Sequence, residues 1–179
     1  MTEVAKAYGG ALYELSLELG NSKDMLEQIS VLKTSFDENP KFSKLLVTPT
    51  LQKQERLTIV DDCFKGKVDQ NVVNFIKILT ENGTVAEFTN CVKEFRNRYN
   101  HDNNIEEATV VSAVALTEDQ KQRLTDKLSA ITGKTILLTN KVDASIIGGI
   151  HLDMDGVELE GSVNSKLDTL RQKLLSVTA

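Results

Sequence analysis

The 179-residue sequence contains little of what marks a disulfide-stabilised or membrane-spanning protein. It has only two cysteines, Cys63 and Cys91, and each falls within a helical pattern of apolar residues. This placement favours two buried thiols in a reducing compartment over a disulfide or a catalytic pair. The longest stretch without a charged residue, 108–117, is far shorter than the roughly 20 apolar residues that span a bilayer. The N-terminus lacks the basic start and apolar run of a signal peptide, so we expect a chain that stays where it is made.

Basic clusters and catalytic motifs are missing as well. The net charge is −5, the pI is about 5.1, and no basic run is interleaved with aromatic residues, which argues against a nucleic-acid partner. The two histidines, His101 and His151, have no carboxylate or cysteine at ligand spacing. No nucleophile elbow, HExxH or CxxC motif occurs. We therefore predict no catalytic residue, no cofactor, no metal site and no small-molecule substrate.

An acidic cluster surrounds Gly156 in the stretch IGGIHLDMDGVELEG: Asp153, Asp155, Glu158 and Glu160. A calcium-binding EF-hand loop needs glycine at its sixth position and oxygen ligands at its first and twelfth positions. Placing Gly156 sixth puts His151 first and Ser162 last, so calcium lacks its first and last ligands. The spacing argues against a metal loop.

The same stretch alternates apolar and polar residues, which is typical of a β-hairpin with one buried face. Its apolar positions are Ile150, Leu152, Met154, Val157 and Leu159. A two-residue turn at 155–156 pairs Leu152 with Leu159 and places His151 and the acidic residues on the opposite, solvated face. The acidic cluster is therefore interpreted as the polar side of a hairpin.

Before about residue 105, apolar residues recur with the spacing of amphipathic α-helices. The expected helices run from Val4 to Leu19, from a Ser22 cap to Phe36, from Pro40 to Thr48, across Leu57 to Phe64, from an Asp69 cap to Asn82, and from a Thr84-x-x-Glu87 capping box to Tyr99. Short turns join them. The pattern predicts an α-helical N-terminal six-helix bundle, residues 1–104.

A polar segment without periodicity, 101–104, is the expected linker to a small α/β domain, residues 105–179. Its expected elements are a strand over 105–116, a helix capped by Thr117-x-x-Gln120 that ends at Gly133, a strand over 135–140, the hairpin, and a final helix capped by Ser162. Apolar residues of this last helix follow a heptad: Val163, Leu167, Leu170, Leu174 and Val177. Two heptads are too few for an isolated coiled coil, so the helix docks either on the sheet or on a helical partner.

The fifth helix, NVVNFIKILTENG, is apolar on more than one face. Its apolar residues are Val72, Val73, Phe75, Ile76, Ile78 and Leu79. Such a helix must be covered all round. The cover is either the other helices of the bundle or, for part of it, a partner protein.

Four collinear stretches carry a family resemblance: YGGALYEL, NFIKILTENG, VVSAVALTEDQ and VDASIIGGIHLDMDGVELEGSVNSKLDTLRQKL. Together they resemble the delta subunit family of bacterial F-type ATP synthase, which is related to the mitochondrial oligomycin-sensitivity-conferring protein. The sequence departs from the family pattern at Gly9-Gly10, Ala144 and Glu160. The glycine pair is expected to weaken the first helix, since each glycine costs about 1 kcal/mol against alanine in a helix.

The resemblance implies a stator subunit and no enzyme of its own. In this family the protein joins the catalytic head to the peripheral stalk, so that rotor torque drives ATP synthesis. The resemblance places it on the cytoplasmic face of the cell membrane, and it meets the membrane only indirectly, through the complex.

By the same resemblance, the partners are the N-terminus of the alpha subunit and the C-terminus of subunit b. The alpha-subunit helix is expected between the first and fifth helices of the bundle, on Tyr8, Ala11, Leu12, Leu15, Val72, Phe75, Ile76 and Leu79. Subunit b is expected on Ile147, Gly148, Gly149, Leu167, Leu170 and Leu174. The residues alone leave two other interpretations open: an unrelated helical adaptor, and a metal enzyme that uses the acidic cluster.

Overall fold

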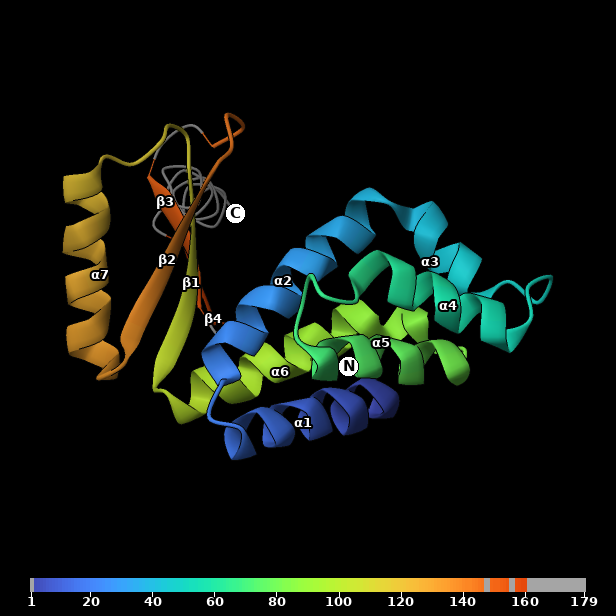
Figure 1. Cartoon of the computed structure of the whole chain (residues 1–179). Helices are drawn as coiled ribbons and strands as arrows, with labels where there is room; N and C mark the ends of the chain where they lie inside the picture. The colour runs from blue at the N-terminus through green and yellow to red at the C-terminus, as the bar shows by residue number, and fades with distance from the viewer. Residues whose placement is uncertain (1, 147–148, 155–156, 161–179) are drawn as a thin grey trace, which may run out of the picture. The chain divides into compact units, whose positions relative to one another are not determined.

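A computed structural model of the chain describes residues 2–146, 149–154 and 157–160 (Figure 1). The chain divides into two compact units, the first ending at Tyr99 and the second starting at Asn100. The boundary lies inside a helix, because α6 (Phe88–Asp102) continues through the first half of the predicted linker. Asn104 ends this stretch with a φ of 52°, a left-handed conformation that asparagine tolerates better than most residues. The linker predicted at 101–104 is therefore half helical.

The N-terminal unit is helical, as its apolar periodicity predicts. Its elements are α1 (Glu3–Glu18), α2 (Ser22–Glu38), α3 (Pro40–Val47), α4 (Lys53–Phe64), α5 (Gln70–Glu81), the 3₁₀ helix η1 (Val85–Glu87) and α6. Pro40 occupies the first turn of α3, where its missing N–H has no intrahelical partner to lose. The Asp69 side chain accepts a hydrogen bond from the Asn71 amide and caps α5, as predicted.

Two of the predicted helix caps are wrong. Thr84 forms no capping box, because 85–87 is a 3₁₀ turn and the Thr84 hydroxyl donates to the Leu79 carbonyl at 3.4 Å. Glu87 instead accepts hydrogen bonds from Thr2 and Asn90. Ser22 is the first residue of α2 and accepts a hydrogen bond from Ser16, so its oxygen is engaged with the end of α1. Each hydroxyl thus bonds back to the helix that precedes it, Thr84 to the end of α5 and Ser22 to the end of α1, instead of capping the helix that follows.

The first and sixth helices touch backbone to backbone. A Cβ atom on Gly9 would lie 2.6 Å from the Cys91 carbonyl oxygen, closer than any side chain permits. Tyr13 packs edge-to-face on Phe95 one turn further along, with ring centroids 5.3 Å apart. Glycine at position 9 therefore weakens the isolated helix but allows α1 to approach α6.

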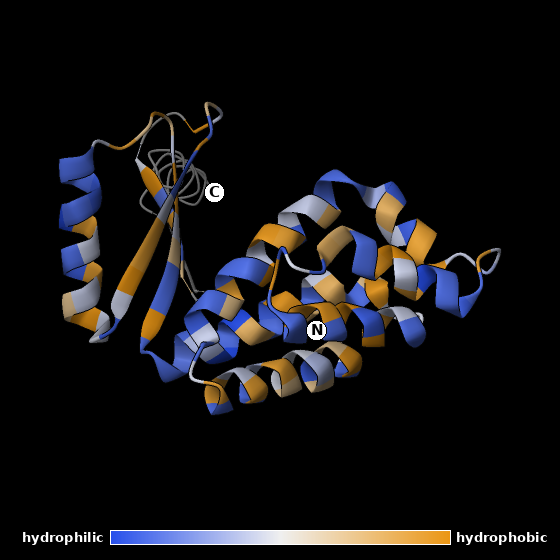
Figure 2. Ribbon diagram, in the orientation of Figure 1, coloured by the Kyte–Doolittle hydropathy of each residue, from blue (hydrophilic) through white to orange (hydrophobic). Residues whose placement is uncertain are grey.

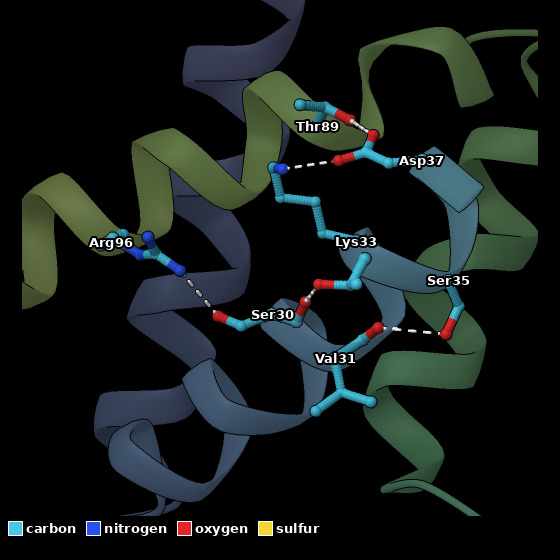
Figure 3. A network of polar contacts seen from close by, with 8 residues as sticks. Ser30, Val31, Lys33, Ser35, Asp37, Thr89 and Arg96 are labelled. Atoms are coloured by element: carbon cyan, nitrogen blue, oxygen red, sulfur yellow. Dashed lines mark hydrogen bonds and ion pairs between the residues drawn. The ribbon is translucent and has the colours of Figure 1, made fainter. Parts of the chain in front are cut away.

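Polar contacts join α2 to α6 outside the apolar core (Figure 3). The Arg96 guanidinium donates to the Ser30 hydroxyl at 3.0 Å, and the Thr89 hydroxyl donates to Asp37 at 3.5 Å. Lys33 reaches the same Asp37 carboxylate at 2.7 Å from one turn earlier on α2. These contacts fix the two helices against each other at the protein surface.

The C-terminal unit is a small α/β fold. Its described elements are β1 (Ile105–Ser112), α7 (Glu118–Thr132), β2 (Thr135–Val142), β3 (Ile150–Met154) and β4 (Val157–Glu160), and the sheet order is β2-β1-β3-β4. Helix α7 forms the crossover between the parallel strands β1 and β2 and packs along one face of the sheet (Figure 1). The core on that face consists of Ala108, Val110, Leu128, Ile136 and Leu152. A helical N-terminal region followed by a small α/β region is thus confirmed.

The hairpin register matches the prediction, with Leu152 opposite Leu159 and Met154 opposite Val157. Leu152 is buried and Asp153 is exposed, as the alternation requires. His151 is half-buried, not fully solvated as predicted, because its strand lies between two others and His151 pairs with Val111. The turn at 155–156 and the predicted final helix lie outside the described residues.

Strand β1 is shorter than predicted. It ends at Ser112, whose hydroxyl donates to the Val114 carbonyl at 2.7 Å and turns the chain away from the sheet. The predicted capping box of the following helix forms in full, with Thr117 and Gln120 exchanging hydrogen bonds at 3.3 and 2.9 Å. Both side chains of this motif make the local hydrogen bonds that the sequence pattern requires.

Candidate partner-binding surfaces

The predicted head-binding residues of α1 differ in burial. Leu12 is 5% exposed and belongs to the core. Ala11 is exposed, while Tyr8 and Leu15 are half-buried. With 3.6 residues per turn, Leu12 lies about 40° around the axis from Tyr8 toward the buried side of α1, whereas Ala11 lies about 60° from Tyr8 toward solvent.

Two further apolar residues extend the outer group, Val4 at 36% and Leu19 at 51% exposure. Together the five residues recur at spacings of four and three along one side of α1, and we call them the α1 stripe: Val4, Tyr8, Ala11, Leu15 and Leu19. Figure 2 shows apolar residues recurring along the whole of this helix. The predicted head-binding set includes neither Val4 nor Leu19, and it includes Leu12, which is buried.

The predicted residues of α5 lie inside the unit. Val72 and Leu79 are fully buried, Ile76 is 1% exposed and Phe75 is 6% exposed, and all belong to the core of the N-terminal unit. Neighbouring helices therefore cover this side of α5. The outer side carries one large apolar residue, Ile78, which is 44% exposed. A partner would contact Ile78 directly, whereas the four buried side chains would support the surface from below.

A hydrogen bond joins the α1 stripe to the end of α5. The amide of Asn82 donates to the Tyr8 hydroxyl at 3.1 Å, across 74 residues of sequence. Tyr8 thus has an apolar ring against the core and a polar tip held by the residue that ends α5. The contact places Tyr8 beside the C-terminal end of α5; the groove between these two helices stays a prediction.

The predicted stalk-binding residues are largely outside the described part of the chain. Ile147, Gly148, Leu167, Leu170 and Leu174 are among those not described. Gly149 is exposed and has a φ of 88°, a left-handed conformation that favours glycine. It directly precedes Ile150, the first residue of β3.

The described residues also bear on the metal-enzyme interpretation. Within this part of the chain, no cluster of three His, Cys, Asp or Glu side chains is placed to hold a metal ion. The exposed His101 lies 3.0 Å from the carboxylate of its neighbour Asp102. Burial raises the pKa of the Cys91 thiol to about 11, so this sulfur stays protonated at neutral pH. No helix among the described residues combines the length and the hydropathy needed to cross a membrane.

Comparison with known proteins gives a consistent result over nearly the whole chain. Residues 4–174 match the family described as ATP synthase delta (OSCP) subunit. The chain is 35% identical to the ATP synthase subunit delta of Lachnoclostridium phytofermentans, covering 97% of this chain and 96% of that protein. It is 32% identical to the subunit of the same name from Lactobacillus gasseri, covering 97% and 95%.

A solved structure shares the fold. One chain of the cryo-EM structure of the Toxoplasma gondii mitochondrial ATP synthase hexamer matches with a TM-score of 0.72 at 17% identity. The match covers 97% of this chain and 98% of that one.

Proposed function

Because this chain belongs to the ATP synthase delta (OSCP) subunit family, we propose that it joins the catalytic head of the enzyme to the peripheral stalk. Members of this family are non-catalytic, stator-associated subunits of F-type ATP synthase, and this chain is such a subunit. The proposal concerns the joint itself: the helical N-terminal region, predicted as residues 1–104, binds the head, and the α/β region, predicted as residues 105–179, binds the stalk. The joint lets rotor torque drive ATP synthesis at the head, and it would lie at the cytoplasmic face of the cell membrane.

On the head side, the proposed partner is the N-terminal helix of the alpha subunit. The observation that carries this proposal is the α1 stripe, an apolar row on the outside of a helix whose inner side is already buried. A row at spacings of four and three suits the apolar side of another amphipathic helix. Tyr8, Ala11 and Leu15 would contact the partner, with Ile78 on the neighbouring helix. Leu12 and the buried residues of α5 would hold these contacts in place.

On the stalk side, the proposed partner is the C-terminus of subunit b. The proposed contacts are Gly149 and, outside the described residues, Ile147, Gly148, Leu167, Leu170 and Leu174. Both joints must persist under repeated load from the rotor. An affinity of about 1 nM corresponds to roughly 12 kcal/mol of binding free energy, and a stator joint needs that order of strength.

A matched pair of leucines tests the head-side contact. Leu17 and Leu19 are both 51% exposed, and helical geometry places them about 160° apart, with only Leu19 on the α1 stripe. Leu19→Asp should weaken binding of an alpha-subunit N-terminal peptide by about tenfold or more, because it puts an unpaired charge into an apolar contact. Leu17→Asp should leave the affinity unchanged.

The measurement is calorimetric titration of the full chain with a peptide from the same organism's alpha subunit, with thermal melts of both variants. Equal affinities for the two variants, with equal melting temperatures, would show that the α1 stripe is not part of the interface. A peptide that does not bind the parent chain would contradict the head-side proposal as a whole.

A further inference from the structure

A pocket of about 270 Å³ opens on the C-terminal unit between α7 and the start of β3. It is lined by Leu116, Gln120, Arg123, Leu124, Lys127 and Ile150. Three of these side chains are apolar and two are cationic. Packing of the core does not require two cations beside these apolar side chains, and the predicted stalk contacts include none of the six lining residues.

The apolar floor of the pocket is held from three separate segments. Leu116, Leu124 and Ile150 are half-buried and pack against the core of the sheet. The Leu116 amide donates to the Asn140 side-chain oxygen at 2.9 Å, which ties the loop before α7 to β2. Ile150 pairs in register with Ser112 on β1. A preformed apolar floor that stays half-exposed suits one apolar side chain of a binding partner.

The rim of the pocket is basic although the chain as a whole carries a net charge of −5. Arg123 contacts Asp119 at 3.1 Å, but both side chains are strongly exposed, at 76% and 69%, and such a pair exchanges partners at little cost. Lys127 makes no hydrogen bond or ion pair with any residue that the structure describes. One helical turn separates the two cations, so both project beside the apolar floor.

We propose that this pocket binds an acidic amphipathic helix of the peripheral stalk. One apolar side chain of that helix fills the floor, and two carboxylates spaced one turn apart meet Arg123 and Lys127. The spacing of the cations selects a helical partner, because acidic residues at i and i+4 have the same separation. The proposal rests on the proposed function in taking subunit b as the partner of this unit.

Two lysines of α7 provide the test. Lys127→Glu reverses the charge at the pocket, and Lys121→Glu reverses it on the same helix outside the pocket, where Lys121 pairs with the exposed Glu118. The full chain is titrated with the C-terminal segment of subunit b from the same organism. We expect Lys127→Glu to weaken binding by about tenfold or more and Lys121→Glu to leave it within about twofold of the parent. Lys127→Arg should keep the parent affinity, and added salt should weaken the parent more than Lys127→Glu.

The outcomes separate the pocket from the connector function. If the segment binds the parent, and Lys127→Glu binds it equally well, the pocket proposal is overturned and the connector function stands. If the segment does not bind the parent chain, both are overturned. If Lys127→Glu instead changes the sedimentation of the free chain, the occupant is a second copy of the protein, and the stalk-helix proposal is overturned.

Discussion

The Gly9 backbone and the Cys91 carbonyl oxygen meet so closely that a Cβ atom on Gly9 would lie 2.6 Å from that oxygen. Helices α1 and α6 thus touch at this point with no side chain between them. The neighbouring Gly10 differs, since a Cβ atom there would meet only the Arg98 guanidinium at 2.7 Å, the far end of a flexible side chain. Two adjacent glycines therefore have different roles.

This difference predicts opposite effects of two alanine substitutions. Gly9→Ala should lower the free energy of unfolding by about 1–3 kcal/mol, because the helices must separate to admit the methyl group. Gly10→Ala should be neutral or stabilise by up to about 1 kcal/mol, because alanine favours the helix and Arg98 can move aside. Denaturant unfolding of both variants checks this. Equal destabilisation by the two substitutions would contradict the close contact.

Core burial of α5 predicts that two apolar residues three positions apart respond differently to a charge. Phe75→Asp should destabilise the N-terminal unit by about 4 kcal/mol or more, since it removes a buried ring and buries a carboxylate. Ile78→Asp should leave the unit folded, because this side chain is 44% exposed. Helical circular dichroism during thermal melting distinguishes them. A Phe75→Asp variant that melts like the parent would show that α5 is not a core helix.

Asn140 should stabilise the C-terminal unit through its side-chain amide. Its oxygen accepts from the Leu116 amide, and its nitrogen donates to the Ser112 hydroxyl and the Val110 carbonyl. Asn140→Ala should cost about 1–3 kcal/mol, because the partly buried Leu116 amide is left without its partner. The exposed neighbour Thr139 supplies the control, and Thr139→Ala should change stability little. Hydrogen exchange at the Leu116 amide should accelerate only in the Asn140 variant.

Burial raises the pKa of the Cys91 thiol from 9.0 to about 11. Between these values the unfolded chain loses the thiol proton while the folded chain keeps it, so the folded state binds more protons. The free energy of unfolding should therefore fall as the pH rises from about 9 to 11. Cys91→Ala should remove this part of the pH dependence, measured as the difference in slope between the variant and the parent. Identical slopes would show that the thiol titrates normally in the folded protein.

Elements with strong local signals could be predicted from the sequence. The alternation around Leu152 and Leu159 set the hairpin register, and Thr117 with Gln120 set the start of α7. Pro40 marked the first turn of α3 in the same way. In each case the side chains that carry the signal also make the local interaction in the folded chain.

The features that were missed depend on contacts made in the folded chain that the local sequence pattern does not specify. Thr84 and Ser22 match helix-cap patterns, but Leu79 and Ser16 engage their hydroxyl groups instead. Leu12, Ala11 and Leu19 are all apolar, so the sequence did not show that Leu12 is buried while Ala11 and Leu19 are exposed. The pocket beside α7 combines the loop, the helix and β3, and no single stretch of sequence contains its floor and its rim.

The most direct test of the connector is a bridging measurement. Subunit b is immobilised, and catalytic heads that lack their own delta subunit are passed over it with and without this chain. The connector proposal predicts that heads are retained only when the chain is present, and that Leu19→Asp lowers retention while Leu17→Asp preserves it. Heads that are retained equally without the chain, or that pass through in its presence, would contradict a joint between head and stalk.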